Sequence, residues 1–288
     1  LKQKLLFLFI LLSTLFALAA CGGHDLGDYN VHLGGEIEET DDQVKIAGET
    51  NLLPGSRVHG AVYLDDGEVL HAEATELIDD KGKFEMEFEH HQYGDAEIIV
   101  TFDFANQMQD EEIIEHYAEG GLEMEGPYVL LDEQWGEPHK KAETKVVLPA
   151  NSEESTYTFK EPEWGEQPDD YGDPRVWIEV DEIEEDGEYF YVQGRSNLLE
   201  GSLISGYYSD RWGVTDETRV NPDGTFSLQI EYKYSEDPYF TITFNPSGSQ
   251  WESIKENYGE NGEKLVGNLV ETSSDRLHVE AIIEYEHE

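Results

Sequence analysis

The chain has 288 residues, of which 65 are acidic and 18 basic, and its formal net charge at pH 7 is −47. This length leaves room for two domains of ordinary size, each able to bury a core. Such an acidic surface argues against nucleic acid as a partner, because that interaction needs basic patches. The chain has one cysteine, which excludes a disulfide bond within it.

The first twenty residues have the pattern of a targeting segment. Lys2 and Lys4 precede an apolar run, Leu5 to Leu12, that is too short and wrongly flanked for a stable membrane span. The run is followed by Leu18-Ala-Ala-Cys21. This stretch resembles the signal peptide of bacterial lipoproteins, in which an aliphatic residue and two small residues precede a cysteine. An ordinary secretory signal with a chance cysteine is the alternative.

The resemblance implies cleavage before Cys21 and attachment of diacylglycerol to its sulfur. The mature chain would then be anchored to the cell membrane on its extracytoplasmic face, and two acyl chains would make that attachment stable. Removing residues 1–20 takes away two of the 18 basic residues and no acidic ones, which leaves a net charge of −49.

The rest of the chain contains one pattern twice. Gly48-Glu-Thr-Asn-Leu-Leu-Pro-Gly-Ser56 returns 146 residues later as Gly194-Arg-Ser-Asn-Leu-Leu-Glu-Gly-Ser202. A slightly shorter spacing relates a further set of pairs: Phe84 and Phe226, Ile113 and Ile254, Tyr117 and Tyr258, Gly121 and Gly262, Gly126 and Gly267, Val129 and Val270. The spacing between matching residues changes only from 146 to 141 along the whole self-match. This small change predicts one domain that has been duplicated.

The domain order follows from this self-match and from composition. Residues 21–30 are predicted to be a short glycine-rich tether and residues 31–149 the first repeat. Residues 150–171, rich in Glu, Ser, Pro, Gly and Asp, are predicted to be a linker. Residues 172–288 form the second repeat.

Most of each repeat is predicted to be strand. Phe84-Glu-Met-Glu-Phe-Glu89 alternates strictly between apolar and acidic residues, and Phe226 to Glu231 repeats the alternation. Asp80-Lys-Gly82 predicts a tight hairpin turn before the first of these strands. One short helix is expected in each repeat, at Gln109 to Tyr117 and at Gln250 to Tyr258.

About seven short strands in each repeat are typical of an antiparallel β-sandwich. We therefore predict an all-β chain of two tandem, duplicated sandwich domains, each with one short helix. The pattern resembles the immunoglobulin-like or transthyretin-like modules that occur in tandem in bacterial surface proteins. A small barrel is the alternative fold.

Signals of a catalytic nucleophile are absent from the sequence. No Gly-x-Ser-x-Gly elbow occurs, and the one cysteine is the predicted anchor. We expect no metal site and no cofactor. His90-His91 would point to opposite faces of a strand, and the pair His59 and His71 has no histidine counterpart in the second repeat.

The polar positions shared by the two repeats are few. Asn and Ser next to the repeated Pro-Gly or Glu-Gly turn are predicted to cap the local backbone, and the shared glutamates are predicted to face water. These residues are Asn51 with Asn197, Ser56 with Ser202, Glu115 with Glu256, and Glu119 with Glu260. Asn221-Pro-Asp-Gly224 is predicted to be a turn and not a calcium loop.

Aromatic residues crowd the second repeat. Exposed rings could stack on sugars or anchor a protein partner, whereas rings half-buried on strands would be the ordinary alternative. The candidate surface consists of Tyr207, Tyr208, Trp212, Tyr232, Tyr234 and Tyr239.

The leading hypothesis is a non-enzymatic, lipid-anchored surface protein whose two sandwich domains bind or space an envelope protein or glycan. The runner-up is a cell-envelope carbohydrate-active hydrolase, or its accessory subunit, that uses a pair of carboxylates in a groove. Two carboxylates with raised pKa values in one deep cleft would favour the runner-up.

The charge also predicts how stability depends on salt. Self-repulsion should make the folded chain from residue 22 onward melt at a higher temperature in molar sodium chloride than in dilute buffer at neutral pH, because salt screens the repulsion. Calorimetric melts at several salt concentrations measure this. An unchanged or lower midpoint in salt would mean that the acidic groups are already compensated within the fold.

Overall fold

The computed structural model describes residues 25–285, apart from residues 41, 65–68, 90–94, 106–107, 134–135, 151, 153–154, 210–214, 233–234 and 236–237. The chain divides into two compact units. Unit 1 holds the described residues up to Glu119 with Glu123–Tyr128 and Ala142–Glu161. Unit 2 holds Gly120–Leu122, Val129–Lys141 and the described residues from Pro162 onward.

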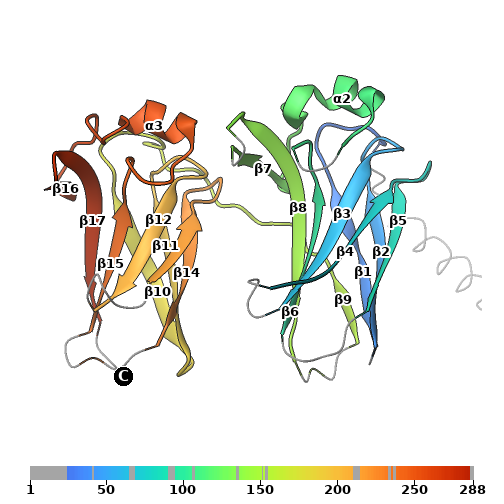
Figure 1. Cartoon of the computed structure of the whole chain (residues 1–288), viewed down its shortest axis with the longest axis horizontal. Helices are drawn as coiled ribbons and strands as arrows, with labels where there is room; N and C mark the ends of the chain where they lie inside the picture. The colour runs from blue at the N-terminus through green and yellow to red at the C-terminus, as the bar shows by residue number, and fades with distance from the viewer. Residues whose placement is uncertain are drawn as a thin grey trace, which may run out of the picture. The chain divides into compact units, whose positions relative to one another are not determined.

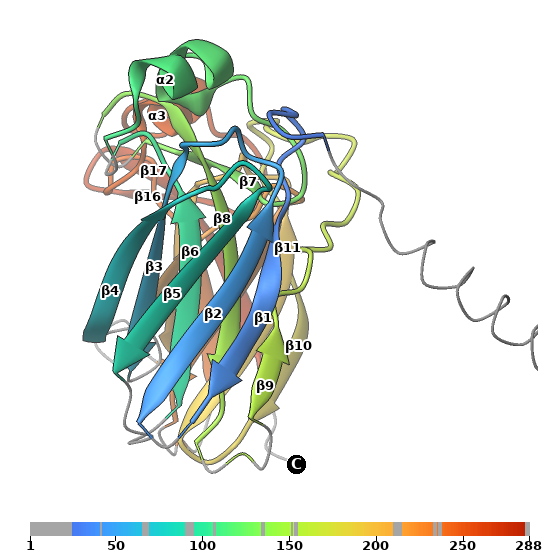
Figure 2. The ribbon, with the colours of Figure 1, turned by 90° about the vertical axis from the view of Figure 1, so that its right-hand side faces the viewer.

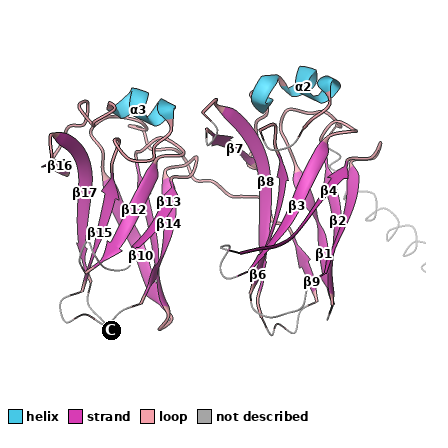
Figure 3. Cartoon of the chain, viewed as in Figure 1, coloured by secondary structure: helices cyan, strands magenta, loops and turns pink. Residues whose placement is uncertain are grey.

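Strands dominate the described residues (Figure 3). In chain order the elements up to residue 158 are β1 (Leu33–Glu39), β2 (Gln43–Thr50), β3 (Arg57–Leu64), β4 (Val69–Leu77), β5 (Lys83–Glu89), β6 (Ala96–Phe102), α2 (Glu111–Tyr117), the 3₁₀ turn η1 (Glu119–Gly121), β7 (Val129–Asp132), β8 (His139–Leu148) and β9 (Thr156–Thr158). They are followed by β10 (Ile178–Glu185), β11 (Tyr189–Ser196), β12 (Leu203–Tyr208), β13 (Thr215–Arg219), β14 (Thr225–Glu231), β15 (Tyr239–Phe244), α3 (Glu252–Tyr258), β16 (Val270–Ser273) and β17 (Arg276–Glu284).

The first set of strands forms two antiparallel sheets, ordered β5-β2-β1-β9 and β4-β3-β6-β8-β7 (Figures 1 and 2). Alternation places one face of each strand in the core. Phe84, Met86 and Phe88 of β5 are buried, and the glutamates between them are exposed. The burial of alternate side chains is what the sequence pattern predicts for a half-buried strand.

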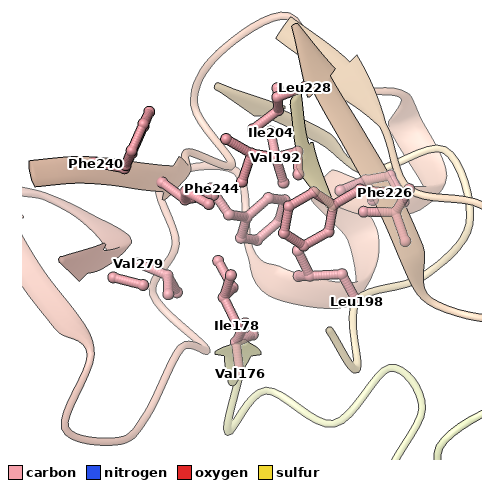
Figure 4. Packing of buried hydrophobic residues seen from close by; sticks show 14 of the residues in the cluster. Val176, Ile178, Val192, Leu198, Ile204, Phe226, Leu228, Phe240, Phe244 and Val279 are labelled. Atoms are coloured by element: carbon pink, nitrogen blue, oxygen red, sulfur yellow. The ribbon is translucent and has the colours of Figure 1, made fainter. Parts of the chain in front are cut away.

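The second set forms sheets ordered β10-β11-β14 and β13-β12-β15-β17-β16, again antiparallel. Their inward faces meet in one apolar cluster (Figure 4). Val192 comes from one sheet and Ile204 and Phe244 from the other, and all three are fully buried. The predicted all-β, antiparallel sandwich architecture is confirmed. Both sets follow the same order of strands, with β9 as the addition in the first.

The repeated Asn-Leu-Leu stretch connects the two sheets of each sandwich, and we call it the sheet crossing. It follows β2 and precedes β3 in one unit, and it follows β11 and precedes β12 in the other. The first leucine of each copy, Leu52 or Leu198, is fully buried in the core. The prediction that one leucine of each copy points into the core is confirmed.

The helices are shorter than the sequence pattern predicts but have the expected face. In α2, Ile113 and Tyr117 are buried, as are Ile254 and Tyr258 in α3. The tyrosine hydroxyl accepts a hydrogen bond from the N–H of the second leucine of the repeated stretch, at 3.0 Å in unit 1 and 3.1 Å in unit 2. The helix is therefore fixed to the sheet crossing by this hydroxyl.

A short turn precedes the first strand in both units, and we call residues 25–30 and 170–175 the lead-in turns. The N–H of Gly27 donates to the Asn51 carbonyl at 2.7 Å, and the N–H of Gly172 donates to the Asn197 carbonyl at 2.7 Å. The side chain of Asp28 or Asp173 accepts the N–H two residues later in its own turn. The predicted tether over residues 21–30 is therefore wrong for residues 25–30, which belong to the folded unit. Residues 21–24, including Cys21, lie outside the described residues.

Asn51 and Asn197 are not local caps, which corrects the sequence prediction. Asn51 Nδ2 donates to the Asn30 carbonyl, and its Oδ1 accepts the N–H of His32, both at 2.7 Å. Asn197 makes the corresponding bonds to Arg175 and Trp177. Each amide therefore joins the sheet crossing to the segment that enters the first strand.

The shared serines also differ from the prediction. Ser56 Oγ and Ser202 Oγ are buried and have no hydrogen-bond partner among the described residues. The turn is closed instead by the backbone, because the N–H of each serine donates to the carbonyl of the second leucine, at 3.0 and 3.1 Å. The side chains therefore pack in the core and do not cap.

The predicted linker, residues 150–171, is mostly held by one unit or the other. β9 pairs with β1, with Tyr157 opposite Ile37. Farther along, the N–H of Gly165 donates to Asp223 Oδ2 at 2.7 Å, and the Tyr171 hydroxyl accepts the N–H of Glu200 at 2.6 Å. Hydrogen bonds of side chains and backbone thus hold the segment that composition predicts to be free.

Among the described residues, no helix is both long and apolar enough to cross a bilayer.

The two glycines of the repeated turn provide a matched test. Gly55 and Gly201 both have positive φ, +89° and +79°. An added Cβ would meet nothing within 4 Å at Gly55 but would lie 1.8 Å from Trp251 Cζ3 at Gly201. We expect Gly55→Ala to cost about 1–2 kcal/mol, from backbone strain alone. Gly201→Ala should cost clearly more in chemical denaturation, and equal costs would contradict the packing described.

The buried tyrosines predict a loss of stability at high pH. Burial raises the pKa of Tyr117 from 10.0 to about 12. The folded state favours the neutral hydroxyl of Tyr117. Its contribution to the free energy of unfolding is therefore complete below about pH 10 and is lost as pH rises from about 10 to 12. Two pKa units correspond to about 3 kcal/mol.

Denaturation of the parent chain and of Tyr117→Phe between pH 8 and pH 12 measures this contribution. The variant should be less stable at pH 8, because the Leu53 N–H loses its acceptor. Its stability should then fall less steeply above pH 10 than that of the parent. Identical slopes would show that the Tyr117 hydroxyl does not titrate as described.

Candidate functional site

Strands β12, β15 and β17 belong to the five-stranded sheet of unit 2 (Figure 1). A cavity of about 500 Å³ lies over the outward face of this sheet. It is lined by Leu203, Ser205, Tyr207, Glu217, Thr243, Asn245, Gly248, Ser249, Gln250, Ser273 and His278. We call this cavity the unit 2 groove. Its lining is rich in hydroxyl and amide groups, which suits a ligand with many hydrogen-bonding groups.

Strand alternation supplies the floor of the groove. On β12, Ile204 and Tyr208 are buried on the inward face, and Leu203, Ser205 and Tyr207 lie on the other. Register aligns Glu217 of β13 and Thr243 of β15 with Ser205. The floor therefore stands on paired strands, which hold its side chains in place.

Hydrogen bonds orient the polar groups of the floor. Ser205 Oγ donates to Glu217 Oε1 at 2.7 Å, which leaves the other carboxylate oxygen able to accept from a ligand. On β17, His278 Nε2 lies 3.7 Å from Glu280 Oε2, and both side chains are mostly buried. The floor thus presents one carboxylate held by a hydroxyl and one imidazole next to an acid.

Gln250 fixes the loop at one end of the groove. Its Oε1 accepts the N–H of Leu203 at 2.8 Å, and its Nε2 donates to the carbonyls of Leu203 and Asn245. In unit 1, Gln109 makes the same three kinds of bond to Arg57 and Asp103. The glutamines are 141 residues apart, the spacing of the neighbouring self-match, so an extended self-match would have identified them.

Of the predicted aromatic surface, Tyr207 is the one member among the described residues that lines the groove. Tyr208 is only 2% exposed, and its ring packs 4.7 Å from Phe190 and 5.1 Å from Phe240, so its assignment to a surface is wrong. Tyr232 is partly buried against the same core, 5.1 Å from Phe190.

Of the remaining aromatic candidates, the structure describes Tyr239, which does not line the groove. Tyr239 begins β15 and is half-buried. Trp212 and Tyr234 lie outside the described residues. Tyrosines that are close in sequence do not share one surface on β12, because side chains alternate along a strand and neighbouring tyrosines point to opposite faces.

Other candidate sites reduce to local interactions. His59 Nε2 lies 3.3 Å from Glu73 Oε2 across the β3–β4 hairpin. Within the part of the chain that the structure describes, no group of three His, Cys, Asp or Glu side chains could hold a metal ion. His90-His91 falls outside that part. At the predicted turn, the Asn221 carbonyl accepts the N–H of Gly224, and Asp223 accepts from Thr225.

Glu217 is the one carboxylate among the described residues that line the groove. Glu217 lies on β13 and Glu280 on β17, which β12 and β15 separate. Three strand spacings put their backbones roughly 14 Å apart. Burial raises the pKa of Glu200, but this residue does not line the groove. The geometry described does not supply a catalytic acid pair in the groove.

The corresponding surface of unit 1 carries different side chains. Arg57 and His59 occupy the positions on β3 that Leu203 and Ser205 occupy on β12. The Arg57 guanidinium donates to the Met108 carbonyl, and His59 pairs with Glu73. Leucine and serine in unit 2 thus stand where unit 1 has an arginine and a histidine that contact neighbouring groups, and a polar hollow lies over the sheet of unit 2.

A scan against models of protein families finds no match for this chain, and no curated protein matches it.

Proposed function

We propose that this chain is a lipid-anchored, extracytoplasmic binding protein without catalytic activity, and that the unit 2 groove binds a glycan. The observation that supports glycan binding is the groove lining, in which hydroxyl, amide and carboxylate side chains occur together with Tyr207. Sugars present hydroxyl groups that both donate and accept, together with C–H faces that pack on aromatic rings. The lining offers both kinds of contact.

The charge of the chain narrows the ligand class. A formal net charge of −47 repels polyanions, and Glu217 places a carboxylate on the groove floor. A neutral glycan, or one that carries amino groups, therefore fits better than an acidic polysaccharide. Charge-assisted hydrogen bonds from such a ligand to Glu217 would be the strongest polar contacts in the groove.

The anchor is proposed from the sequence. Leu18-Ala-Ala-Cys21 resembles the processing site of bacterial lipoproteins, and the cysteine is the only one in the chain. A lipid on Cys21 would place both units outside the cytoplasm, where envelope glycans are accessible. The hydrolase alternative receives no support from a specific pair of carboxylates in the groove.

Calorimetric titration of the chain from residue 22 onward with neutral glucan, chitin and chitosan oligosaccharides tests the groove. Tyr207→Ala should weaken binding roughly tenfold, the equivalent of about 1.4 kcal/mol. Glu217→Gln should weaken chitosan binding more than glucan binding, because it removes a charge.

The matched control is Tyr63→Ala, which removes a half-buried tyrosine from β3, the counterpart of β12 in unit 1. It should leave binding unchanged. The proposal fails if none of the three glycan classes binds, or if Tyr63→Ala and Tyr207→Ala have the same effect.

A further inference from the structure

We infer that one end of unit 1 lies directly against the lipid headgroups of the membrane that holds Cys21. This end contains the lead-in turn at residues 25–30 and helix α2, and we call it the α2 end. The inference rests on the lipid anchor proposed above, and it adds which surface faces the bilayer and how closely.

The lead-in turn is fixed to the α2 end by several independent contacts. Besides the bonds from Asn51, His116 Nε2 lies 2.6 Å from the Gly27 carbonyl oxygen. The ring of Tyr29 stacks on His116 with centroids 5.1 Å apart and an interplanar angle of 10°. Glu125 closes the turn from the other side, because its N–H donates to the Tyr29 carbonyl and its carbonyl accepts the N–H of Val31.

These contacts leave very little free chain. Asp25 follows Cys21 by four residues, which span at most about 14 Å when fully extended. Strand β1 alone has seven residues and is about 23 Å long. The greatest possible distance between Cys21 and Asp25 is thus shorter than strand β1. The α2 end therefore cannot move far from the bilayer.

The side chains at the α2 end fit this placement. Leu26 and Tyr29 are each 39% exposed, Ile114 is 37% exposed and Met108 is 86% exposed. Apolar and tyrosine side chains of this kind are favoured at a membrane interface.

The charge of α2 specifies the lipid. Glu111, Glu112 and Glu115 are exposed on the helix, so an anionic headgroup layer would repel this end. A zwitterionic surface would not. The partner of the α2 end is therefore a zwitterionic lipid surface, approached through the tether at Cys21.

The single cysteine makes the test direct. In the lipidated protein the Cys21 sulfur is blocked, so a cysteine introduced elsewhere can be labelled alone. Asp42 is exposed beyond the far end of β1, and Glu112 is exposed on α2 (Figure 2). Full-length Asp42→Cys and Glu112→Cys would each carry a donor fluorophore and would be reconstituted in phosphatidylcholine vesicles with an acceptor on some headgroups.

We expect energy transfer to be severalfold stronger from position 112 than from position 42. Inserting about twelve Gly and Ser residues between Gly23 and His24 should remove most of the difference, because the unit can then reorient. Equal transfer from both positions, or a spacer without effect, would overturn the inference.

Vesicle flotation separates this failure from failure of the proposed anchor. If the parent chain does not float with vesicles, or if Cys21→Ser floats equally well, the lipid anchor is wrong and the inference falls with it. If the parent floats, Cys21→Ser does not, and the two labelled positions transfer equally, the anchor stands and the inference alone is wrong.

Discussion

One buried side-chain amide in each unit connects segments that are far apart in the sequence. Asn51 and Asn197 are nearly fully buried, and each satisfies backbone groups of the chain that enters the first strand. A buried backbone N–H or carbonyl without a partner costs about 1–3 kcal/mol. The amide therefore determines where the lead-in turn lies, and its neighbouring residues determine the rest. The next leucine fills the core, and the one after it binds the helix tyrosine.

This arrangement separates scaffold from surface. Inward positions and the sheet crossing are alike in the two units, because packing and hydrogen bonding constrain them. Outward positions on the same strands face no such constraint, and β3 and β12 differ there. The proposed glycan groove uses this freedom. Its floor consists of outward residues on paired strands, so binding side chains can change without any change in the core.

The sequence predicts those features of the fold that depend on local periodicity. Alternation in β5 and β14 identifies both strands, and the spacing of Ile113 and Tyr117 identifies the buried face of α2. Features that depend on contacts between distant segments were missed. Composition suggests a tether before residue 31 and a linker before residue 172, yet residues 25–30 form one lead-in turn and the other begins at residue 170, within the predicted linker.

A longer self-match would have revealed these turns. Asp25, Gly27 and Asp28 correspond to Asp170, Gly172 and Asp173 at a spacing of 145 residues. The spacing becomes 146 beyond the register shift between Val180 and Glu182 in β10, a bulge that accommodates one extra residue. For the proposed groove, the sequence pointed to the same unit and to Tyr207, but not to the polar residues of the lining. Crowding of tyrosines reports neither the face of the strand on which each ring lies nor the polar neighbours that register brings to Tyr207.

The position of β1 within its sheet has a consequence for the time course of folding. Ile37 pairs on one side with Ile46, a near neighbour in the chain, and on the other with Tyr157, which lies at the far end of the unit's sequence. The sheet cannot be completed until that distant segment is present, and closing so large a loop has an entropic cost before any contact compensates it. Such a topology favours slow folding. For the export proposed above, slow closure of the sandwich would leave the extended chain more time to be moved across a membrane.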